Sequence, residues 1–216
     1  MYIILILFFI FLVLVLMLLG NHWSFVLPAP TEHRCSFESN ADLKCSSKNT
    51  LNLTNLLVHE TNEALREYVS TSKNNPCSPQ VPDEVPSTTV AGSNMIEKLQ
   101  DIYAKNELFS LHLSEVERYQ KELFATASIL GPFLKASSAL KTRLKHLLTK
   151  VECHIKSNDP LTPVPTSPPP LSLPHKYSYE KKVYGCAVIV RLKDWGQNVK
   201  EVVKSMCSRN VVRSRS

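Results

Sequence analysis

The six cysteines are the residues with the most informative chemistry in this sequence. They are Cys35, Cys45, Cys77, Cys153, Cys186 and Cys207. An even number of cysteines in an exported chain predicts up to three disulfides. A zinc site would need more ligands at short spacing, but there is no C-x-x-C pair, and no second ligand pair accompanies the adjacent Cys153 and His154. We therefore expect disulfides, with no metal and no other cofactor.

The other residue types do not form a catalytic motif. The seven histidines are dispersed from His22 to His175, and neither G-x-S-x-G nor H-E-x-x-H occurs. Every cysteine has a possible bridge partner, so no thiol is left over as a nucleophile. With 5 glycines against 14 prolines, Gly-rich phosphate-binding loops are poorly supported. We expect a protein that is not an enzyme.

The N-terminal stretch from Tyr2 to Leu19 is apolar and carries no charge. It predicts a secretory signal peptide over residues 1–24, with cleavage near residues 20–24, and one extracellular domain over residues 25–216. The stretch is also close to the length of a membrane span, so a retained signal anchor is the alternative. The charge of +6 and the pI near 9.0 favour acidic partner surfaces or sulfated glycans. We expect no nucleic-acid partner and no membrane insertion after cleavage.

The elements that position the cysteines are expected to be helices. Apolar residues recur at helical spacing in four segments, at about 47–72, 93–118, 128–156 and 179–207. Each segment has one face to bury, and the face of the first segment consists of Leu53, Leu56, Leu57, Ala64, Leu65 and Tyr68. Gly131 and Pro132 suggest a late start or a kink in the third segment. The pattern predicts an all-α fold.

The lengths of the connections predict the topology of the bundle. A helix of about 25 residues is roughly 38 Å long, so a parallel neighbour requires a crossover of at least about 12 extended residues. The Pro-rich stretches 73–92 and 157–176 are long enough, whereas only residues 119–127 join the second helix to the third. Long, short and long connections predict an up-up-down-down four-helix bundle of the long-chain cytokine type.

This topology sorts the cysteines between the two ends of the bundle. Cys77 follows the first helix and Cys186 begins the fourth, so both belong to one end, while the other four belong to the opposite end. A disulfide requires Cα atoms within about 7 Å of each other, which excludes bridges from one end to the other. The topology therefore predicts the pair Cys77–Cys186 and leaves the pairing of the other four cysteines open.

Two blocks of the sequence resemble a known family. The stretches LLTKVEC, residues 147–153, and YEKKVYGC, residues 179–186, are similar to the leukaemia inhibitory factor and oncostatin M subfamily of the interleukin-6 cytokines. In that subfamily a cysteine before the first helix bridges to the end of the third helix. The resemblance thus implies the pair Cys45–Cys153, and elimination then pairs Cys35 with Cys207.

The resemblance also implies a receptor anchor at the start of the fourth helix. The family has a phenylalanine followed by a lysine three positions later, which matches Tyr179 and Lys182 here and implies a leukaemia-inhibitory-factor-type receptor as partner. An aromatic ring beside a lysine at i and i+3 supplies an apolar contact with a charged neighbour. The alternative is an aromatic that caps the helix by packing on the Pro-rich connection.

A second surface is implied on the first and third helices, where the family binds the shared transducer glycoprotein 130. The corresponding residues are Asn52, Asn55, His59, Thr142, Arg143, His146 and Thr149. They lie off the apolar face, as the residues of any solvated helix face do. Asn52 also begins the only N-x-S/T sequon, so it is a candidate glycosylation site, and a glycan there would obstruct this surface.

Together these features predict a secreted, monomeric cytokine that assembles class I receptors, namely glycoprotein 130 with a leukaemia-inhibitory-factor-type or related chain. Receptor-bound Janus kinases and STAT factors would then transmit the signal. A ligand similar to ciliary neurotrophic factor would share the aromatic and lysine motif. The alternatives outside this class are a secreted helical carrier of an apolar ligand and a signal-anchored cell-surface protein.

Overall fold

The structure is a computed structural model that describes residues 40–72, 76–77, 82–124 and 127–213, with side chains described outside 40–46, 127–128 and 207–213. The chain divides into two compact units, Met1–Arg34 and Cys35–Ser216, and every described residue belongs to the second unit. The expected signal peptide over residues 1–24 and its cleavage region therefore lie outside the described residues.

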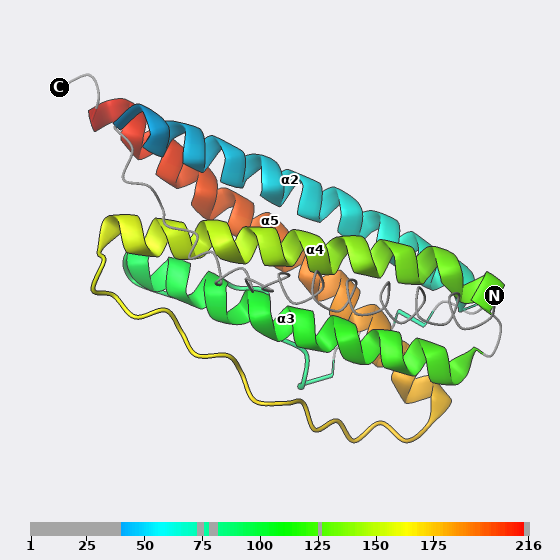
Figure 1. Cartoon of the computed structure of the whole chain (residues 1–216). Coiled ribbons are helices and arrows are strands. Elements are labelled where there is room, and N and C mark those ends of the chain that lie inside the picture. Colours follow the sequence, from blue (N-terminus) through cyan, green and yellow to red (C-terminus); the bar gives the residue numbers. More distant parts are fainter. Residues whose placement is uncertain (1–39, 73–75, 78–81, 125–126, 214–216) are drawn as a thin grey trace, which may run out of the picture. The chain divides into compact units, whose positions relative to one another are not determined.

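Four long helices form the described part of the chain (Figure 1): α2 Asn40–Thr71, α3 Met95–Leu123, α4 Ala127–Asn158 and α5 Ser178–Arg213. No strand occurs within the described ranges. The prediction of an all-α fold with four helices is confirmed. None of these helices is both long enough and apolar enough to cross a bilayer, as far as the described residues extend.

The start of α3 shows how the sequence sets a helix boundary. Gly92 has φ +127°, and a Cβ there would lie 2.7 Å from the Lys98 nitrogen, so this position favours glycine. Asn94 then caps the helix, because its side-chain oxygen accepts the Glu97 N–H at 2.9 Å. Glu97 in turn accepts the Ser93 N–H at 2.7 Å, and this bond is the main reason that the pKa of Glu97 is lowered.

The third helix starts earlier than Gly131, since α4 begins at Ala127 and continues through Gly131 and Pro132. Both residues are exposed. Pro132 is the sixth residue of α4, so its missing N–H removes one helical hydrogen bond near the N-terminal end. The expectation of a late start is therefore wrong, because this stretch continues the helix.

Each helix packs against two of the other three. Helix α2 packs on α4 and α5, and α3 packs on the same two helices, so that α2 lies diagonally opposite α3 (Figure 1). Contacts between the ends of neighbouring helices show whether the helices run parallel or antiparallel to each other. Near the start of α2, Thr50 Oγ1 lies 3.0 Å from Nε2 of His154 at the end of α4. The Tyr68 hydroxyl, near the end of α2, donates to the Lys182 carbonyl at the start of α5 at 2.9 Å. Helix α2 is therefore antiparallel to α4 and to α5.

The faces that meet inside the bundle are mainly aliphatic with a few large rings. The Phe109 and Trp195 ring centroids lie 5.2 Å apart, and Tyr68 meets Phe133 edge to face at 5.3 Å. The largest completely buried side chains come from all four helices: Leu57, Tyr68, Leu99, Ile102, Phe109, Leu113, Tyr119, Phe133, Leu140, Leu144, Tyr184 and Trp195. Burial of these faces is the main contribution to the stability of the fold.

The buried face of α2 differs from the expected one. Leu57, Ala64 and Tyr68 are buried, but Leu56 is 43% exposed, so its assignment to this face is wrong. Successive helical residues differ by about 100°, and the face that contains Leu57 turns Leu56 outward. Threonines occupy part of the face instead. Thr61, for example, is buried and donates from Oγ1 to the Leu57 carbonyl at 2.6 Å, which satisfies its hydroxyl inside the helix.

The end of α2 and the start of α5 approach each other very closely. A disulfide joins Cys77 to Cys186, with the two Cα atoms 5.3 Å apart. One residue earlier, a Cβ on Gly185 would lie 2.2 Å from the Tyr68 hydroxyl oxygen, so the tyrosine fills the space that any side chain would need. The glycine allows the Tyr68 hydroxyl to reach the Lys182 carbonyl across the helix pair.

We expect Gly185→Ala to lower the free energy of unfolding by about 1–3 kcal/mol, because the new methyl group must displace the buried Tyr68 ring. Urea denaturation followed by circular dichroism measures this change. Gly131→Ala is the matched control, since a Cβ there meets no atom within 4 Å. The control should leave stability unchanged or raise it by up to about 1 kcal/mol. Equal stabilities of the two variants would contradict the packing of Tyr68 on Gly185.

Candidate functional site

The two residues that the sequence singles out at the start of α5 have different surroundings. Tyr179 is 71% exposed, so its ring does not pack on the Pro-rich connection as a capping aromatic would. Tyr177, just before the helix, is equally exposed. Lys182 is half-buried, and its Nζ lies 5.5 Å from the centroid of the Phe124 ring at the C-terminal cap of α3. The start of α5 thus presents a free aromatic ring beside a lysine that rests on a second ring.

Glu180 holds the backbone at the first turn of α5. Its Oε2 accepts the N–H groups of Lys176 at 3.1 Å and of Tyr177 at 3.2 Å. These amides precede or begin the helix and would otherwise lack intrahelical acceptors. The negative charge of Glu180 also suits the positive end of the helix dipole, which the neighbouring lysines do not. The exposed Tyr179 is therefore displayed on an ordered helical turn.

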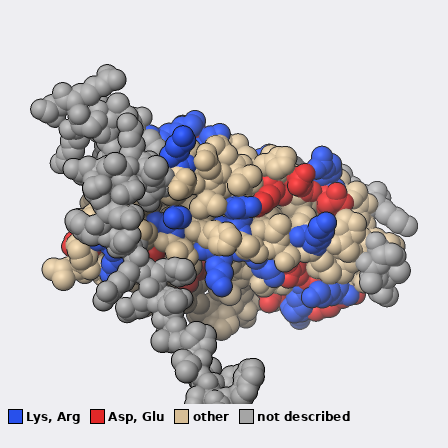
Figure 2. All heavy atoms as spheres, turned by 45° about the horizontal axis from the view of Figure 1, so that its top comes forward, with Lys and Arg blue, Asp and Glu red and all other residues tan. Residues whose placement is uncertain are grey.

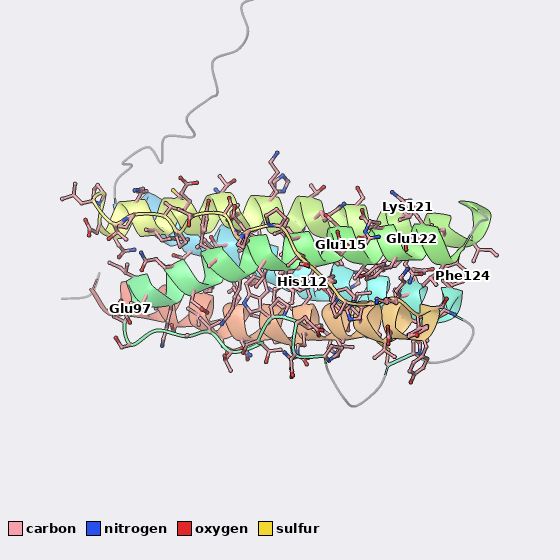
Figure 3. The ribbon with its side chains drawn as sticks, turned by 90° about the horizontal axis from the view of Figure 1, so that it is seen from below. Glu97, His112, Glu115, Lys121, Glu122 and Phe124 are labelled. Carbon is pink, nitrogen blue, oxygen red and sulfur yellow. A yellow bond between two sulfur atoms is a disulfide. The ribbon has the colours of Figure 1, made fainter. Side chains whose placement is uncertain are left out.

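Ion pairs attach the start of α5 to the end of α3. Lys181 donates to Glu122 at 2.7 Å, and Glu122 also pairs with Arg118. The bond from Lys181 is the largest cause of the lowered pKa of Glu122. Both cations lie over the Tyr119 ring, with Arg118 at 4.6 Å and Lys181 at 5.2 Å from its centroid. Figure 3 shows Glu122 and Phe124 together at this end of α3, beside the start of α5.

The second expected surface lies on α2 and α4, which pack against each other. Most of its expected residues are exposed on the two helices: Asn52, Asn55, His59, Thr142, His146 and Thr149. Two of these side chains bond within their own helix, because the hydroxyls of Thr142 and Thr149 donate to backbone carbonyls one turn earlier. In Figure 2, where the top of Figure 1 is turned forward, Lys and Arg side chains are spread over the face, and most acidic side chains lie toward the right.

Arg143 differs from the exposed members of this set, because it forms an ion pair with the other helix. Its Nη2 and Nε lie 2.6 and 3.1 Å from the two carboxylate oxygens of Glu60 on α2, a bidentate pair. The side chains of Arg143 and Glu60 are only 22% and 17% exposed. Hydrogen bonding to Glu60 raises the pKa of Arg143. This pair joins α2 to α4, so Arg143 has a structural contact that sequence spacing did not reveal.

The candidate glycosylation site at Asn52 lies on the exposed side of α2. Thr54, which completes the sequon, is buried and donates to the Leu51 carbonyl at 2.8 Å. An oligosaccharide is attached to the asparagine nitrogen, so the exposure of Asn52 is compatible with a glycan on the folded chain. Glycosylation of Asn52 stays a prediction.

Of the expected disulfides, Cys77–Cys186 is the pair whose two side chains are both described. Cys153 is also disulfide-bonded. The side chains of Cys35, Cys45 and Cys207 lie outside the described residues, and so do the expected pairs Cys45–Cys153 and Cys35–Cys207.

A cluster of buried rings beneath the start of α5 was not expected from the sequence. His112 of α3 is buried, and its Nδ1 lies 2.6 Å from the hydroxyl oxygen of the buried Tyr184 on α5. His175, on the connection before α5, stacks on Tyr184 with ring centroids 4.6 Å apart, and its Nδ1 lies 3.4 Å from the Tyr119 hydroxyl. A sequence signal existed, because His112 occupies an inward position between Phe109 and Val116 of α3.

Burial determines the protonation of His112 and Tyr184. It lowers the pKa of His112 to about 4 and raises that of Tyr184. Both groups are therefore neutral at physiological pH. His154 at the other end of the bundle is similar, because burial lowers its pKa to about 4 and its ring contacts the Thr50 hydroxyl. Each buried imidazole has a hydroxyl partner.

These histidines do not join other ligands in a metal site. No group of three or more His, Cys, Asp or Glu side chains within the described ranges could hold a metal ion. No family model, no curated protein and no solved structure matches the chain. The features that bear on function are thus the start of α5, the α2/α4 surface and the buried ring cluster.

We expect a double-mutant cycle of Glu60→Ala and Arg143→Ala to give a coupling of about 1 kcal/mol, because the pair is bidentate and half-buried. Urea denaturation of the two single variants and the double variant measures it. The control cycle uses Glu63 and Arg66, an exposed pair 3.4 Å apart within α2, for which we expect less than about 0.5 kcal/mol. A coupling no larger than that of the control would mean that Arg143 does not hold the helices together.

Proposed function

We propose that this protein is a secreted cytokine of the interleukin-6 family type, which brings glycoprotein 130 together with a leukaemia-inhibitory-factor-type receptor chain. The association would allow receptor-bound Janus kinases to phosphorylate each other and STAT factors. The observation that carries the proposal is the exposure of Tyr179 on an ordered helix start, at the position where the family that the sequence resembles has its receptor-binding aromatic residue.

The directions of the helices support an up-up-down-down bundle of the long-chain type. Helix α2 runs antiparallel to α4 and α5, as the Thr50–His154 and Tyr68–Lys182 contacts indicate. The Lys181–Glu122 contact between the start of α5 and the end of α3 indicates that α3 is antiparallel to α5 as well. On this basis α2 and α3 point one way, and α4 and α5 point the other. The long connections 72–94 and 159–177 are the two crossovers that this order requires.

The start of α5 has the physical properties of an interface anchor. Tyrosine is among the residues that contribute most to binding, because it buries a large rigid ring and keeps a polar tip. The Glu180 bonds, the Lys181–Glu122 pair and the disulfide at Cys186 hold the turn in place before any partner arrives. An anchor that is already ordered loses little conformational entropy on binding. Lys182, resting on Phe124, adds a positive charge beside the exposed ring.

The α2/α4 surface is proposed to bind glycoprotein 130 through its exposed residues Asn55, His59, Thr142, His146 and Thr149. Arg143 would position this surface by joining α2 to α4, since Glu60 occupies its guanidinium. A glycan on Asn52 would cover one end of the surface and shift the contact toward His59. To test this effect, STAT phosphorylation is measured in cells treated with enzymatically deglycosylated protein and in cells treated with untreated protein.

We expect the double substitution of Tyr179→Ala and Lys182→Ala to reduce binding to a leukaemia inhibitory factor receptor ectodomain at least about 100-fold, since hot-spot residues each contribute about 2 kcal/mol or more. Surface-binding measurements with the mature chain, followed by STAT phosphorylation in cells that carry both receptors, test this. Binding to the glycoprotein 130 ectodomain should persist, because α2 and α4 are unchanged.

Leu161→Ala is the matched control for this substitution. Leu161 is 91% exposed and follows the end of α4, the helix end that contacts the start of α2, away from the start of α5. It removes an exposed apolar side chain and should leave receptor binding unaltered. Unchanged signalling by the double variant would refute the assignment of the anchor. Extraction of lipid by the purified chain, without binding to either ectodomain, would favour the carrier of an apolar ligand instead.

A further inference from the structure

Two members of the ring cluster, His175 and Tyr184, lie close in sequence to the proposed receptor anchor at Tyr179. His175 precedes Tyr177 by two residues and Tyr179 by four, and its ring contacts the buried rings of Tyr119 and Tyr184. Its ring stacks on Tyr184, which contacts His112 beneath it. Figure 3 shows His112 on the side of α3 toward α5. The first turns of α5 and the residues before them therefore contact rings that include two imidazoles.

The contact between His112 and Tyr184 suits neutral groups only. When both groups are neutral, one hydrogen bond joins His112 Nδ1 to the Tyr184 hydroxyl oxygen, 2.6 Å away, and either group can be the donor. A protonated imidazole donates from both nitrogens, so Tyr184 could only accept, and its own hydrogen would need another acceptor. The groups stacked on Tyr184 are the rings of Tyr119 and His175. Because Tyr184 stays a neutral phenol, it offers no negative charge to an imidazolium.

The charged groups around the cluster do not compensate for a buried cation. The charges of Glu115 on α3 and of Glu84 on the connection before α3 raise the pKa of His112, but burial lowers this pKa by more. Helix α4, which also packs on α3, supplies no group that acts on His112 among the described residues. On the His175 side, Arg118 of α3 and Lys181 of α5 lie over the adjoining Tyr119 ring, with Glu122 paired to both.

We propose that the His112–Tyr184–His175 cluster is an acid-sensitive latch, which holds the start of α5 and its receptor anchor at neutral pH and releases them in a mildly acidic compartment. The latch would let the receptor complex formed at the cell surface dissociate after internalisation. This inference deepens the proposed function and, as far as the receptor is concerned, rests on it.

The direction of the effect follows from linkage. The ordinary pKa of histidine is about 6.5, and in the closed bundle the pKa of His112 is about 4. The opened segment therefore binds more protons than the closed one between pH 6.5 and pH 4. Both states are largely neutral at pH 7.4, so the latch is closed there. At pH 5.5 these two pKa values make the opening equilibrium about tenfold more favourable than at pH 7.4.

His154 provides a separate response at the other end of the bundle. It contacts Thr50 on α2, and the neighbouring Lys150 adds to the lowering of its pKa by burial. Its protonation would loosen α2 from α4 without touching the start of α5. A test of the latch must therefore compare segments of the chain, because overall stability reports on both ends.

Hydrogen exchange of backbone amides in the disulfide-intact mature chain separates the segments. After correction for the pH dependence of intrinsic exchange, we expect protection over residues 178–187 to fall about tenfold between pH 7.4 and pH 5.5. Residues 192–199, in the middle of α5, serve as the internal reference and should change less. Equal changes in the two segments, or no change in the first, would overturn the latch.

His112→Asn is the test variant, because its amide can replace Nδ1 in the contact with Tyr184 but does not titrate at these pH values. It should keep the protection of residues 178–187 at pH 7.4 and lose the fall at pH 5.5. A fall as large as in the wild type would refute the role of His112. If this variant does not fold, a nuclear magnetic resonance titration of the wild type decides. His112 should stay neutral in the folded chain at pH 5.5, and titration near pH 6.5 would overturn the proposal.

Dissociation from the leukaemia inhibitory factor receptor ectodomain tests the consequence for the anchor. The wild type should dissociate several-fold faster at pH 5.5 than at pH 7.4, and this ratio of rates should be smaller for His112→Asn. Because both proteins bind the same ectodomain, histidines of the receptor contribute equally to the two ratios. Equal ratios would refute release through the latch. Absence of binding at pH 7.4 would count against the proposed function alone, since hydrogen exchange requires no receptor.

Discussion

The close approach of the end of α2 to the start of α5 is the constraint on which the arrangement of this protein depends. The Tyr68 hydroxyl occupies the space beside Gly185, since a Cβ on this residue would lie 2.2 Å from the hydroxyl oxygen. The same hydroxyl donates a hydrogen bond to the Lys182 carbonyl. Cys77 and Cys186 close the same junction covalently. Because a helix is rigid over these distances, fixing one end of α5 against α2 also fixes which residues of α5 face inward along its length.

Several consequences follow at this end of the bundle. With the register of α5 set, Tyr184 points into the interior toward His112, while Tyr179 points into solvent. Lys181 reaches Glu122, and Lys182 lies over Phe124, so α5 is attached to α3 as well as to α2. The proposed receptor anchor is thus a small exposed surface supported by buried contacts from two other helices. Such support favours tight binding, since little has to become ordered in the complex.

Two polar contacts in the interior have similar chemistry. His112 with Tyr184 and His154 with Thr50 are each an imidazole and a hydroxyl that are satisfied when neutral. The two buried imidazoles are thus each matched to one hydroxyl group, and Tyr184, the partner of His112, lies on the helix that carries the proposed anchor.

Local patterns in the sequence were enough to predict the four helices and the place of Cys77 and Cys186 at one end, because apolar periodicity and connection length are properties of short stretches of chain. The family resemblance, not a local pattern, singled out Tyr179, which is exposed in the structure. Local patterns were misleading at Leu56, because threonines such as Thr61 complete the buried face of α2 by bonding their own helix, and a hydropathy pattern does not reveal that bond.

Other features were decided by the tertiary structure alone. Arg143 was expected among exposed binding residues, and only the packing of α2 on α4 places Glu60 beside it. The cluster of His112, Tyr184 and His175 joins residues from α3, α5 and a connection, which have no common sequence pattern. The sequence by itself determined which faces of the helices are apolar and which lengths of chain connect them. The contacts between particular residues depended on the register of one helix against another, which is set by the shapes of the side chains that pack between them.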